Sequence, residues 1–256
     1  MNLTVPFIEA FGLYILRTST LILAAPLLGS GTGFSSYKIA LIVGISVAAF
    51  MSTGEPLVEE AGAIEFAMMC LHEVMIGMFL AFVLQMVLLS VRVAGEIIGT
   101  EMSFNMASLV DPNTGIQTPL ITQIYEVMFF LSLLSINGHH WLLRALGSSF
   151  ERAPIGGIGM KEGLLPMILT LFTRMFSAGI VLGGPILVLL MMVSVLIGFL
   201  SRVVPQINVM EVGFNIRISV GLVALLIFSP YIAPGMNMLF EHLMTGLGDC
   251  LDALEA

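Results

Sequence analysis

The feature that most limits how this chain can fold is an apolar block at residues 164–200. At about 37 residues, it is nearly twice as long as one membrane-spanning helix requires. The sequence Gly183-Gly184-Pro185 lies inside the block, so we expect its helix to kink there or to divide into two. Shorter apolar segments occupy residues 5–28, 38–51, 64–91, 119–136 and 216–233. This pattern predicts an all-α fold of the membrane-protein type, with hydrophobic helical hairpins, about six apolar helical segments and some broken helices.

The composition indicates a chain that is surrounded by lipid or by other apolar protein. Hydrophobic residues make up 58% of its 256 residues, and charged residues make up only 10%. One soluble core could not bury so much apolar surface, which argues against a soluble enzyme. The net charge is −8, and the nine Lys and Arg residues are scattered, so no basic stripe could follow a phosphate backbone. We therefore expect no nucleic-acid partner.

A polar stretch at residues 92–122 separates the third and fourth apolar segments. It contains glycine and proline residues, which disfavour regular helix, and four charged side chains: Arg92, Glu96, Glu101 and Asp111. Irregular backbone finds no hydrogen-bond partner in hydrocarbon. We therefore expect this stretch to lie in water, inside protein or along the wall of a cavity.

An apolar cluster lies within this stretch, where the chain is expected to leave its helix. Met102 and Met106 flank Phe104 at helical spacing, and a turn containing Asp111-Pro112-Asn113 follows. Methionine re-packs easily because its side chain is long, flexible and polarizable. A soft apolar cluster on a short loop suits a reversible seal, and our hypothesis is that this stretch closes a pore.

The remaining boundaries are predicted from polarity and from proline. Residues 137–163 are polar and contain glycine, so we expect a connection there. Pro230 and Pro234 are expected to end the last long apolar run, because proline cannot donate the backbone hydrogen bond that a helix interior needs.

Several charged or titratable side chains lie inside the apolar segments. They are Arg17, His72, Glu73, Glu126 and Arg174. Such groups are costly in hydrocarbon and normally face protein or a wet cavity. Three explanations stay open: pairing with one another or with helix ends, contacts with neighbouring subunits, and relay of protons or ions.

The motifs of catalysis and of metal binding are incomplete in this sequence. His72-Glu73 begins an HExxH pattern, but Ile76 occupies the position of the second histidine. His139 and His140 are adjacent, so a helix would point them about 100° apart. No set of serine, histidine and carboxylate is recognisable. We therefore expect neither enzymatic activity nor a cofactor or metal.

Small residues four positions apart predict close helix packing. Gly95 and Gly99 form one such pair, and Gly179 and Gly183 form another. Ser194 and Gly198 form a third pair. Each pair can present a flat helical face to another backbone, which favours a tightly built helical assembly.

Six short motifs follow one another along nearly the whole chain. They are Gly95–Gly99; Met102 and Phe104 with Asp111-Pro112; Asn137-Gly138-His139; Pro154–Gly157; Arg202–Gln206; and Gly213-Phe214. In this order the motifs resemble those of the FliR family of flagellar biosynthetic proteins and of its SctT relatives in type III secretion. A series of spaced motifs is far more specific than any one of them.

The resemblance implies a core component of the flagellar export gate. It implies a place in the flagellar basal body at the bacterial inner membrane, and assembly with FliP-type and FliQ-type subunits into a helical multi-subunit cone. Further partners would be a FlhB-type export switch protein, membrane lipid and the exported, unfolded flagellar proteins. Gating would be passive, with the energy supplied by other components.

The resemblance also divides the single export-gate domain of residues 1–256. It implies N-terminal helices at 1–137 with a plug loop at 105–118, and a FliQ-like hairpin at 164–233. The implied plug and gate residues are Met102, Phe104, Asn105, Met106, Asp111, Pro112 and Asn113. The chain departs from the family pattern at Glu101 and Ser103, where we expect Gln and Gly in many relatives, and this changes the polarity at the root of the plug.

The residues expected to pack the assembly combine buried charges, close-packing glycines and a polar turn. They are Arg17, Gly95, Glu96, Gly99, Glu126, Arg174, Gly179, Gly183, Arg202, Pro205, Gln206 and Asn208. The turn at 202–208 contains a charge, a proline and two amide side chains at the exit of a long helix. We expect it to meet neighbouring subunits or a cytoplasmic export component.

Two other classes of protein share some of these features. A secondary transporter or a channel subunit of the inner membrane would also contain broken helices and buried charges. Secondary transporters usually have corresponding breaks in two related halves, and the break at Gly183-Gly184-Pro185 has no counterpart in the first half. An intramembrane enzyme would require converging catalytic groups, which the sequence does not indicate.

Overall fold

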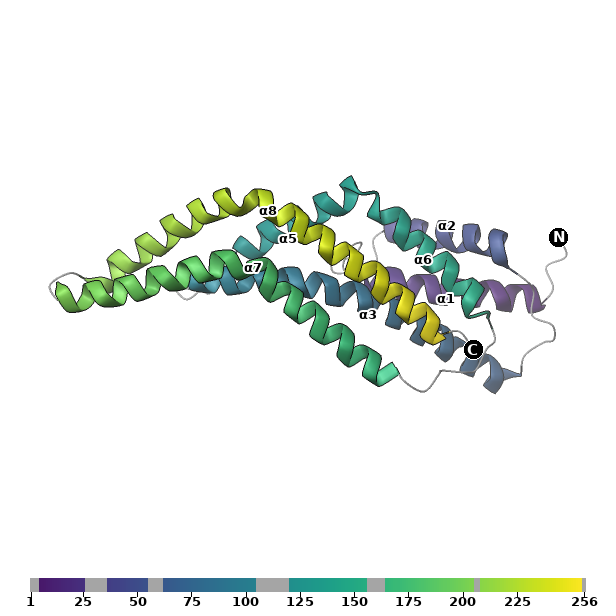
Figure 1. The fold of residues 1–256 in the computed structure, drawn as a ribbon. Helices are drawn as coiled ribbons and strands as arrows, with labels where there is room; N and C mark the ends of the chain where they lie inside the picture. The colour runs from purple at the N-terminus through teal and green to yellow at the C-terminus, as the bar shows by residue number, and fades with distance from the viewer. Residues whose placement is uncertain are drawn as a thin grey trace. The chain divides into compact units, whose positions relative to one another are not determined.

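The computed structural model describes residues 5–25, 36–54, 62–104, 120–155, 164–204 and 208–254. Within these ranges the regular structure is helical and contains no strand (Figure 1). The helices are α1 (Val5–Ala24), α2 (Ser36–Thr53), α3 (Ala63–Glu101), α5 (Leu120–Ser135), α6 (Gly138–Arg152), α7 (Leu164–Val203) and α8 (Val209–Leu254). The predicted all-α fold is confirmed.

The helices also have the length and the apolar character that the sequence predicts. Five of those described could cross a membrane by these two criteria, namely α1, α2, α3, α7 and α8. A sixth span results if α5 and α6, which only Ile136 and Asn137 separate, are counted together as one broken span. The predicted number of about six apolar segments therefore agrees with the structure.

Helix α3 continues past its predicted end at Val91. The apolar segment was expected to end at Val91, but the helix continues through residues 92–101, which form its last turns. Of the three charged side chains in this part, Arg92 and Glu96 are exposed and Glu101 is partly buried, whereas Gly95 and Ile98 are buried. This alternation has the period of a helix, so the charges mark the polar face of α3 rather than its end.

Residues 137–163 are not simply a connection, because residues 138–152 form α6. Leu142, Leu146 and Phe150 follow one another at intervals of four residues, which places them on one helical face. Leu146 and Phe150 are buried. The polar composition of the segment therefore reflects a surface helix with a narrow apolar face.

Prolines lie inside the two longest helices without ending them. Pro185 lies within the 40 residues of α7, which Figure 1 shows bent near its middle and not divided. Pro230 and Pro234 lie within the 46 residues of α8, so the helix continues past them, although its apolar span ends at Ile232, close to the predicted end of the apolar run. Proline removes one backbone hydrogen bond and bends a helix, but the turns on either side can continue it.

The chain forms two compact units, which are described separately. Unit 1 contains Met1–Met86, Asn137–Leu171 and His242–Ala256, and unit 2 contains Val87–Ile136 and Phe172–Glu241. Helices α3, α7 and α8 each contribute residues to both units. The domain boundaries implied by the resemblance, 1–137 and 164–233, stay a prediction.

In unit 1, an aromatic cluster joins α1, α2 and α6. The ring of Tyr14 stacks on that of Phe150 with centroids 4.3 Å apart, and it meets Phe50 edge-on at 5.2 Å. Phe7 and Phe11 also contact Phe50 edge-on. These are the preferred geometries of aromatic pairs, so the rings fix how the three helices pack.

Arg17 lies at the centre of unit 1, fully buried. Its Nε and Nη2 donate to the two carboxylate oxygens of Glu73 on α3, at 2.5 and 3.0 Å. The same guanidinium donates to the carbonyl oxygens of Ser149 and Ala153 at the end of α6, at 2.7 and 2.9 Å, and lies over the ring of Phe150. Pairing with another charge and with a helix end, one of the explanations left open by the sequence, is confirmed for Arg17 and Glu73.

Candidate functional site

The candidate site is the part of unit 2 where α3 ends, immediately before the predicted plug. The backbone N–H of Phe104 donates to the carbonyl of Gly99 at 3.0 Å, and that of Ser103 donates to Thr100 at 2.9 Å. Ser103 has a φ of 64°, in the left-handed region. This combination is a Schellman cap, which satisfies the last carbonyls of a helix and fixes the direction in which the chain leaves it.

The conformation of Ser103 predicts how this position responds to substitution. Left-handed backbone costs an L residue about 1–2 kcal/mol, and glycine avoids this cost. We expect Ser103→Val to lower the free energy of unfolding by about 1–2 kcal/mol, because a β-branched side chain tolerates this backbone poorly. We expect Ser103→Gly to stay within about 1 kcal/mol of the parent. Thermal unfolding of the purified proteins in one detergent measures both changes, and equal stability of the two variants would contradict the expectation.

Met102 is fully buried and anchors the end of α3. It packs against Gly221 of α8, where an added Cβ would lie 2.6 Å from the Met102 Sδ. A larger residue at this position would require the Met102 side chain to move. Phe104 is partly exposed, whereas the other predicted plug residues, Asn105, Met106, Asp111, Pro112 and Asn113, lie outside the described residues.

Arg217 of α8 lies beside the same cap. Its Nη1 donates to the hydroxyl oxygen of Ser103 at 3.5 Å, which is a long hydrogen bond. Its Nε is buried and has no hydrogen-bond partner among the residues that the structure describes. Arg217 and Gly221 are one helical turn apart, so α8 contacts the end of α3 through two neighbouring positions.

Helix α5 packs closely against α3 and begins after the predicted plug. An added Cβ at Gly95 would lie 2.5 Å from the Cα of Thr122, which shows how near the two backbones are. One turn away, the Arg92 Nε donates to the Glu126 Oε1 at 2.5 Å. Arg92 precedes Gly95 on α3, whereas its partner Glu126 follows Thr122 on α5. The two helices are therefore antiparallel. The two ends of the intervening segment are therefore attached to neighbouring helices.

Helix α7 packs against α3 through small residues on both helices. An added Cβ at Gly179 would lie 2.6 Å from the carbonyl oxygen of Ser90, and one at Gly183 would lie 3.4 Å from that of Ala94. Gly183 follows Gly179 by four residues on α7, and Ala94 follows Ser90 by four residues on α3. The two helices therefore run parallel here. The spacing of Ser90 and Ala94 was overlooked in the sequence, although the rule that found the two glycines also fits them.

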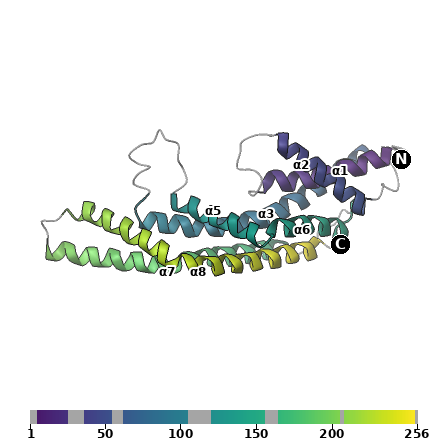
Figure 2. The ribbon, with the colours of Figure 1, turned by 90° about the horizontal axis from the view of Figure 1, so that it is seen from above.

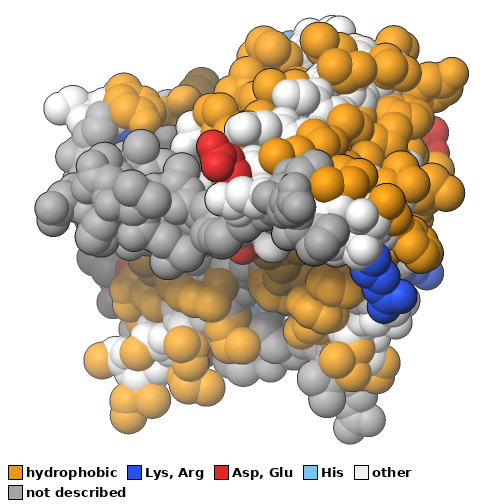
Figure 3. All heavy atoms as spheres, turned by 90° about the vertical axis from the view of Figure 1, so that its left-hand side faces the viewer, with side chains coloured by type: hydrophobic (Ala, Val, Ile, Leu, Met, Phe, Trp, Pro, Cys, Tyr) orange, Lys and Arg blue, Asp and Glu red, His pale blue; other side chains and the backbone are white. Residues whose placement is uncertain are grey.

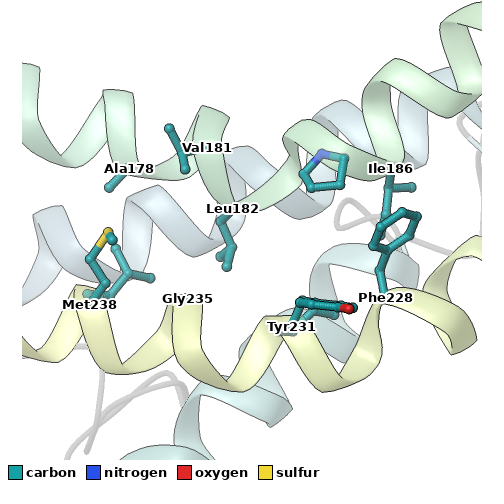
Figure 4. A pocket seen from close by; sticks show the side chains of 11 residues that line it. Ala178, Val181, Leu182, Ile186, Phe228, Tyr231, Gly235 and Met238 are labelled. Carbon is teal, nitrogen blue, oxygen red and sulfur yellow. The ribbon is translucent and has the colours of Figure 1, made fainter.

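Helices α7 and α8 form an antiparallel hairpin within unit 2, and Figures 1 and 2 show them side by side. Gly213 faces Ile197, and Gly235 approaches Leu182. An apolar pocket of about 150 Å³ lies between the two helices (Figure 4). Its lining includes Phe228 and also Pro185, whose missing N–H removes a helical hydrogen bond to the Val181 carbonyl. The pocket therefore lies where α7 is bent.

Apolar side chains remain exposed along much of this hairpin. Among the most exposed are Val181, Met192, Leu196, Phe199, Leu226 and Tyr231. Hydrophobic side chains also cover much of the face shown in Figure 3. An exposed apolar surface of this size is expected only where lipid or another protein covers it.

The other predicted assembly residues all belong to unit 2. Glu96 and Arg174 are exposed on α3 and α7, and Gly99 is buried. Arg202 is exposed in the last turn of α7, and the Asn208 amide donates to the Glu211 carboxylate at 3.4 Å. Pro205 and Gln206 lie outside the described residues. The roles of all these residues in assembly stay predictions.

Comparison with known proteins identifies the family. The model of a family described as bacterial export proteins, family 1, matches residues 8–243. This match covers nearly the whole chain. The chain belongs to this family.

Individual members of this export family match over similar lengths. The flagellar biosynthetic protein FliR of Escherichia coli is 30% identical over 94% of this chain and 92% of its own length. FliR of Bacillus subtilis is 29% identical over 89% of this chain and 88% of its own length. The surface presentation of antigens protein SpaR of Shigella flexneri is 24% identical, over 78% and 77%. The resemblance to the FliR and SctT family is therefore confirmed.

Proposed function

We propose that this export-family protein is a core subunit of the flagellar type III export gate, where it helps to form and to plug the export channel. The observation that carries the proposal is the family match over residues 8–243, together with relatives named FliR. By this proposal, the protein acts in the bacterial inner membrane at the flagellar basal body. It is a gate and catalyses no reaction.

The lengths of the long helices support assembly with other subunits. Helices α7 and α8 have 40 and 46 residues, so each is about 60–70 Å long, roughly twice the hydrocarbon thickness of a bilayer. Lipid alone could not cover such helices from end to end. Apolar subunits of the FliP and FliQ type would cover the remainder, and the α7–α8 hairpin is the part that resembles a FliQ-type subunit.

The plug is assigned to residues 105–118. Its two flanks are fixed in unit 2: the cap at Ser103 and the Met102 contact with Gly221 hold one, and the Gly95–Thr122 contact holds the other. A loop with fixed flanks can change its own arrangement without unpacking the helices that carry it. The exported, unfolded flagellar proteins and neighbouring subunits, including a FlhB-type switch protein, would favour its open arrangement.

The plug is tested by replacing residues 105–118 with a short Gly-Ser linker in the chain co-expressed with its FliP-type and FliQ-type partners. We expect the complex to assemble and to conduct small ions several-fold more than the parent in planar bilayers, even without substrate. The same linker in place of residues 55–61, between α2 and α3, provides the control and should leave the complex sealed. Met102 is left intact, because its contact with Gly221 is part of the packing.

Two outcomes would contradict parts of this function. If complexes with the shortened 105–118 loop assemble and conduct no more ions than the parent, the plug lies elsewhere in the assembly. If the unaltered chain does not purify with FliP-type and FliQ-type subunits, the proposed assembly is wrong. A membrane transporter that works alone would give the second result and would be stable without these partners.

A further inference from the structure

Arg217 is partly buried, and its guanidinium has few hydrogen-bond partners among the described residues. The group carries five N–H donors, but within the described residues it makes only the 3.5 Å hydrogen bond to the Ser103 hydroxyl. Its Nε is buried and finds no hydrogen-bond partner in the part of the chain that the structure describes. The hydroxyl of Ser103 is neutral, so it does not compensate the positive charge. Among the described residues, Arg217 therefore leaves most of its N–H donors without a protein partner.

Two other arginines of this chain form ion pairs with carboxylates. Arg17 is buried and binds both carboxylate oxygens of Glu73 and two backbone carbonyls. Arg92 is half exposed and still pairs with Glu126. Removing a charge from water without a counter-charge costs several kcal/mol, and charges in membrane-type helices are therefore normally paired. Arg217 is partly buried, and its only hydrogen bond among the described residues is to a neutral hydroxyl.

We propose that Arg217 binds a carboxylate of a neighbouring subunit, at the place where α8 contacts the end of α3. The inference rests on the proposed assembly with other export-gate subunits. One carboxylate fits the charge, because Arg217 is the only Lys or Arg between residues 209 and 254. Phospholipid headgroups are typically bound by clusters of basic residues, which α8 does not provide. The planar guanidinium can bind both oxygens of a carboxylate at once.

The position of Arg217 connects this subunit contact to the root of the proposed plug. Arg217 contacts Ser103, the left-handed residue of the α3 cap, and lies one turn from Gly221, which holds Met102. A carboxylate bound at Arg217 would hold α8 in place against the cap. The neighbouring subunit would thereby stabilise the direction in which the chain leaves α3.

The site is tested in the chain co-expressed and purified with FliP-type and FliQ-type subunits. We expect Arg217→Gln to lower the amount of partner recovered per inserted chain by about tenfold or more, as for loss of a desolvated charge pair. The amount of partner recovered with Arg217→Lys should lie between that of the parent and that of Arg217→Gln, because an ammonium keeps the charge but lacks the planar guanidinium geometry. Arg92→Gln is the matched control, since the carboxylate partner of Arg92 lies in the same chain, and it should recover nearly as much partner as the parent.

Charge reversal distinguishes a lost ion pair from a misfolded variant. Cells with Arg217→Glu should lose motility, and motile revertants should carry an Asp or Glu to Lys or Arg change in a neighbouring subunit. Such a revertant identifies the partner residue and supports the proposal. Compensating changes confined to this chain, for example at Asp111, would overturn it, as would a photocrosslink from position 218 to phospholipid alone.

The result for the parent complex separates this proposal from the function on which it rests. If the parent recovers its partners and Arg217→Gln recovers just as many, the carboxylate site is wrong and the gate function stands. If the parent recovers none, the proposed assembly and the carboxylate site are both wrong.

Discussion

Arg17→Met is expected to lower the free energy of unfolding by about 3–5 kcal/mol, because it leaves Glu73 as an unpaired buried charge. Both side chains are fully buried, so water cannot replace the lost partner. The carbonyls of Ser149 and Ala153 also lose the hydrogen bonds that the Arg17 guanidinium donates, which weakens the attachment of α6. Thermal unfolding in a single detergent measures the change, and fluorescence of Trp141 on α6 reports the attachment of that helix.

Two controls show whether the uncompensated charge is responsible. Changing both Arg17 to Met and Glu73 to Leu removes both charges, so we expect this variant to be clearly more stable than Arg17→Met alone. Arg92→Gln with Glu126→Gln removes the more exposed pair and should change stability by about 1 kcal/mol or less. If the double change at 17 and 73 is as destabilising as the single one, lost packing is the cause and the electrostatic explanation is wrong.

The helices that the sequence predicted best are those with long, continuous apolar runs. The block at 164–200 corresponds to α7 at 164–203, and the run at 38–51 corresponds to α2 at 36–53. Hydropathy is sufficient to predict a helix in such segments, because nearly every residue of the run is apolar. The prediction that the third apolar helix ends at Val91, before Arg92 and Glu96, failed for a different reason. Charge alone does not separate the exposed face of a helix from its end.

Prolines and short amphipathic helices were harder to interpret. Whether Pro185 bends or ends a helix depends on packing against neighbouring helices, which local sequence does not contain. Residues 138–152 have only a narrow apolar face, and their polar composition concealed it. In both cases tertiary contacts decided between two outcomes that the sequence permits.

The root of the proposed plug could be predicted from the sequence only in part. Met102 was predicted from the sequence, and Ser103 was recognised as a departure from the glycine expected in many relatives. The left-handed backbone at Ser103 shows why glycine would suit that position. Gly221 and Arg217 were not singled out, because they meet the end of α3 across more than one hundred residues of chain. A lone glycine in a long helix gives no sign of the side chain that packs against it.

Gly179→Ala is expected to destabilise unit 2 by about 1–3 kcal/mol, the usual range for overpacking a close contact. The added methyl group would lie 2.6 Å from the carbonyl oxygen of Ser90 and 3.2 Å from its Cα. These are backbone atoms of α3, so they cannot rotate away, and the two helices would have to separate. The recovery of FliP-type and FliQ-type partners should fall as well, because unit 2 supplies the proposed plug.

Gly183→Ala is the matched control, one turn further along the same face of α7. Its methyl group would lie 3.4–3.6 Å from atoms of Ala94, which is ordinary van der Waals contact. Alanine also favours helix over glycine by about 1 kcal/mol, so this variant should be as stable as the parent or more so. Thermal unfolding of both variants in the same detergent measures the difference. If Gly179→Ala and Gly183→Ala lower the stability equally, the close contact between Gly179 and Ser90 is not the cause. Both glycines would then pack against another subunit.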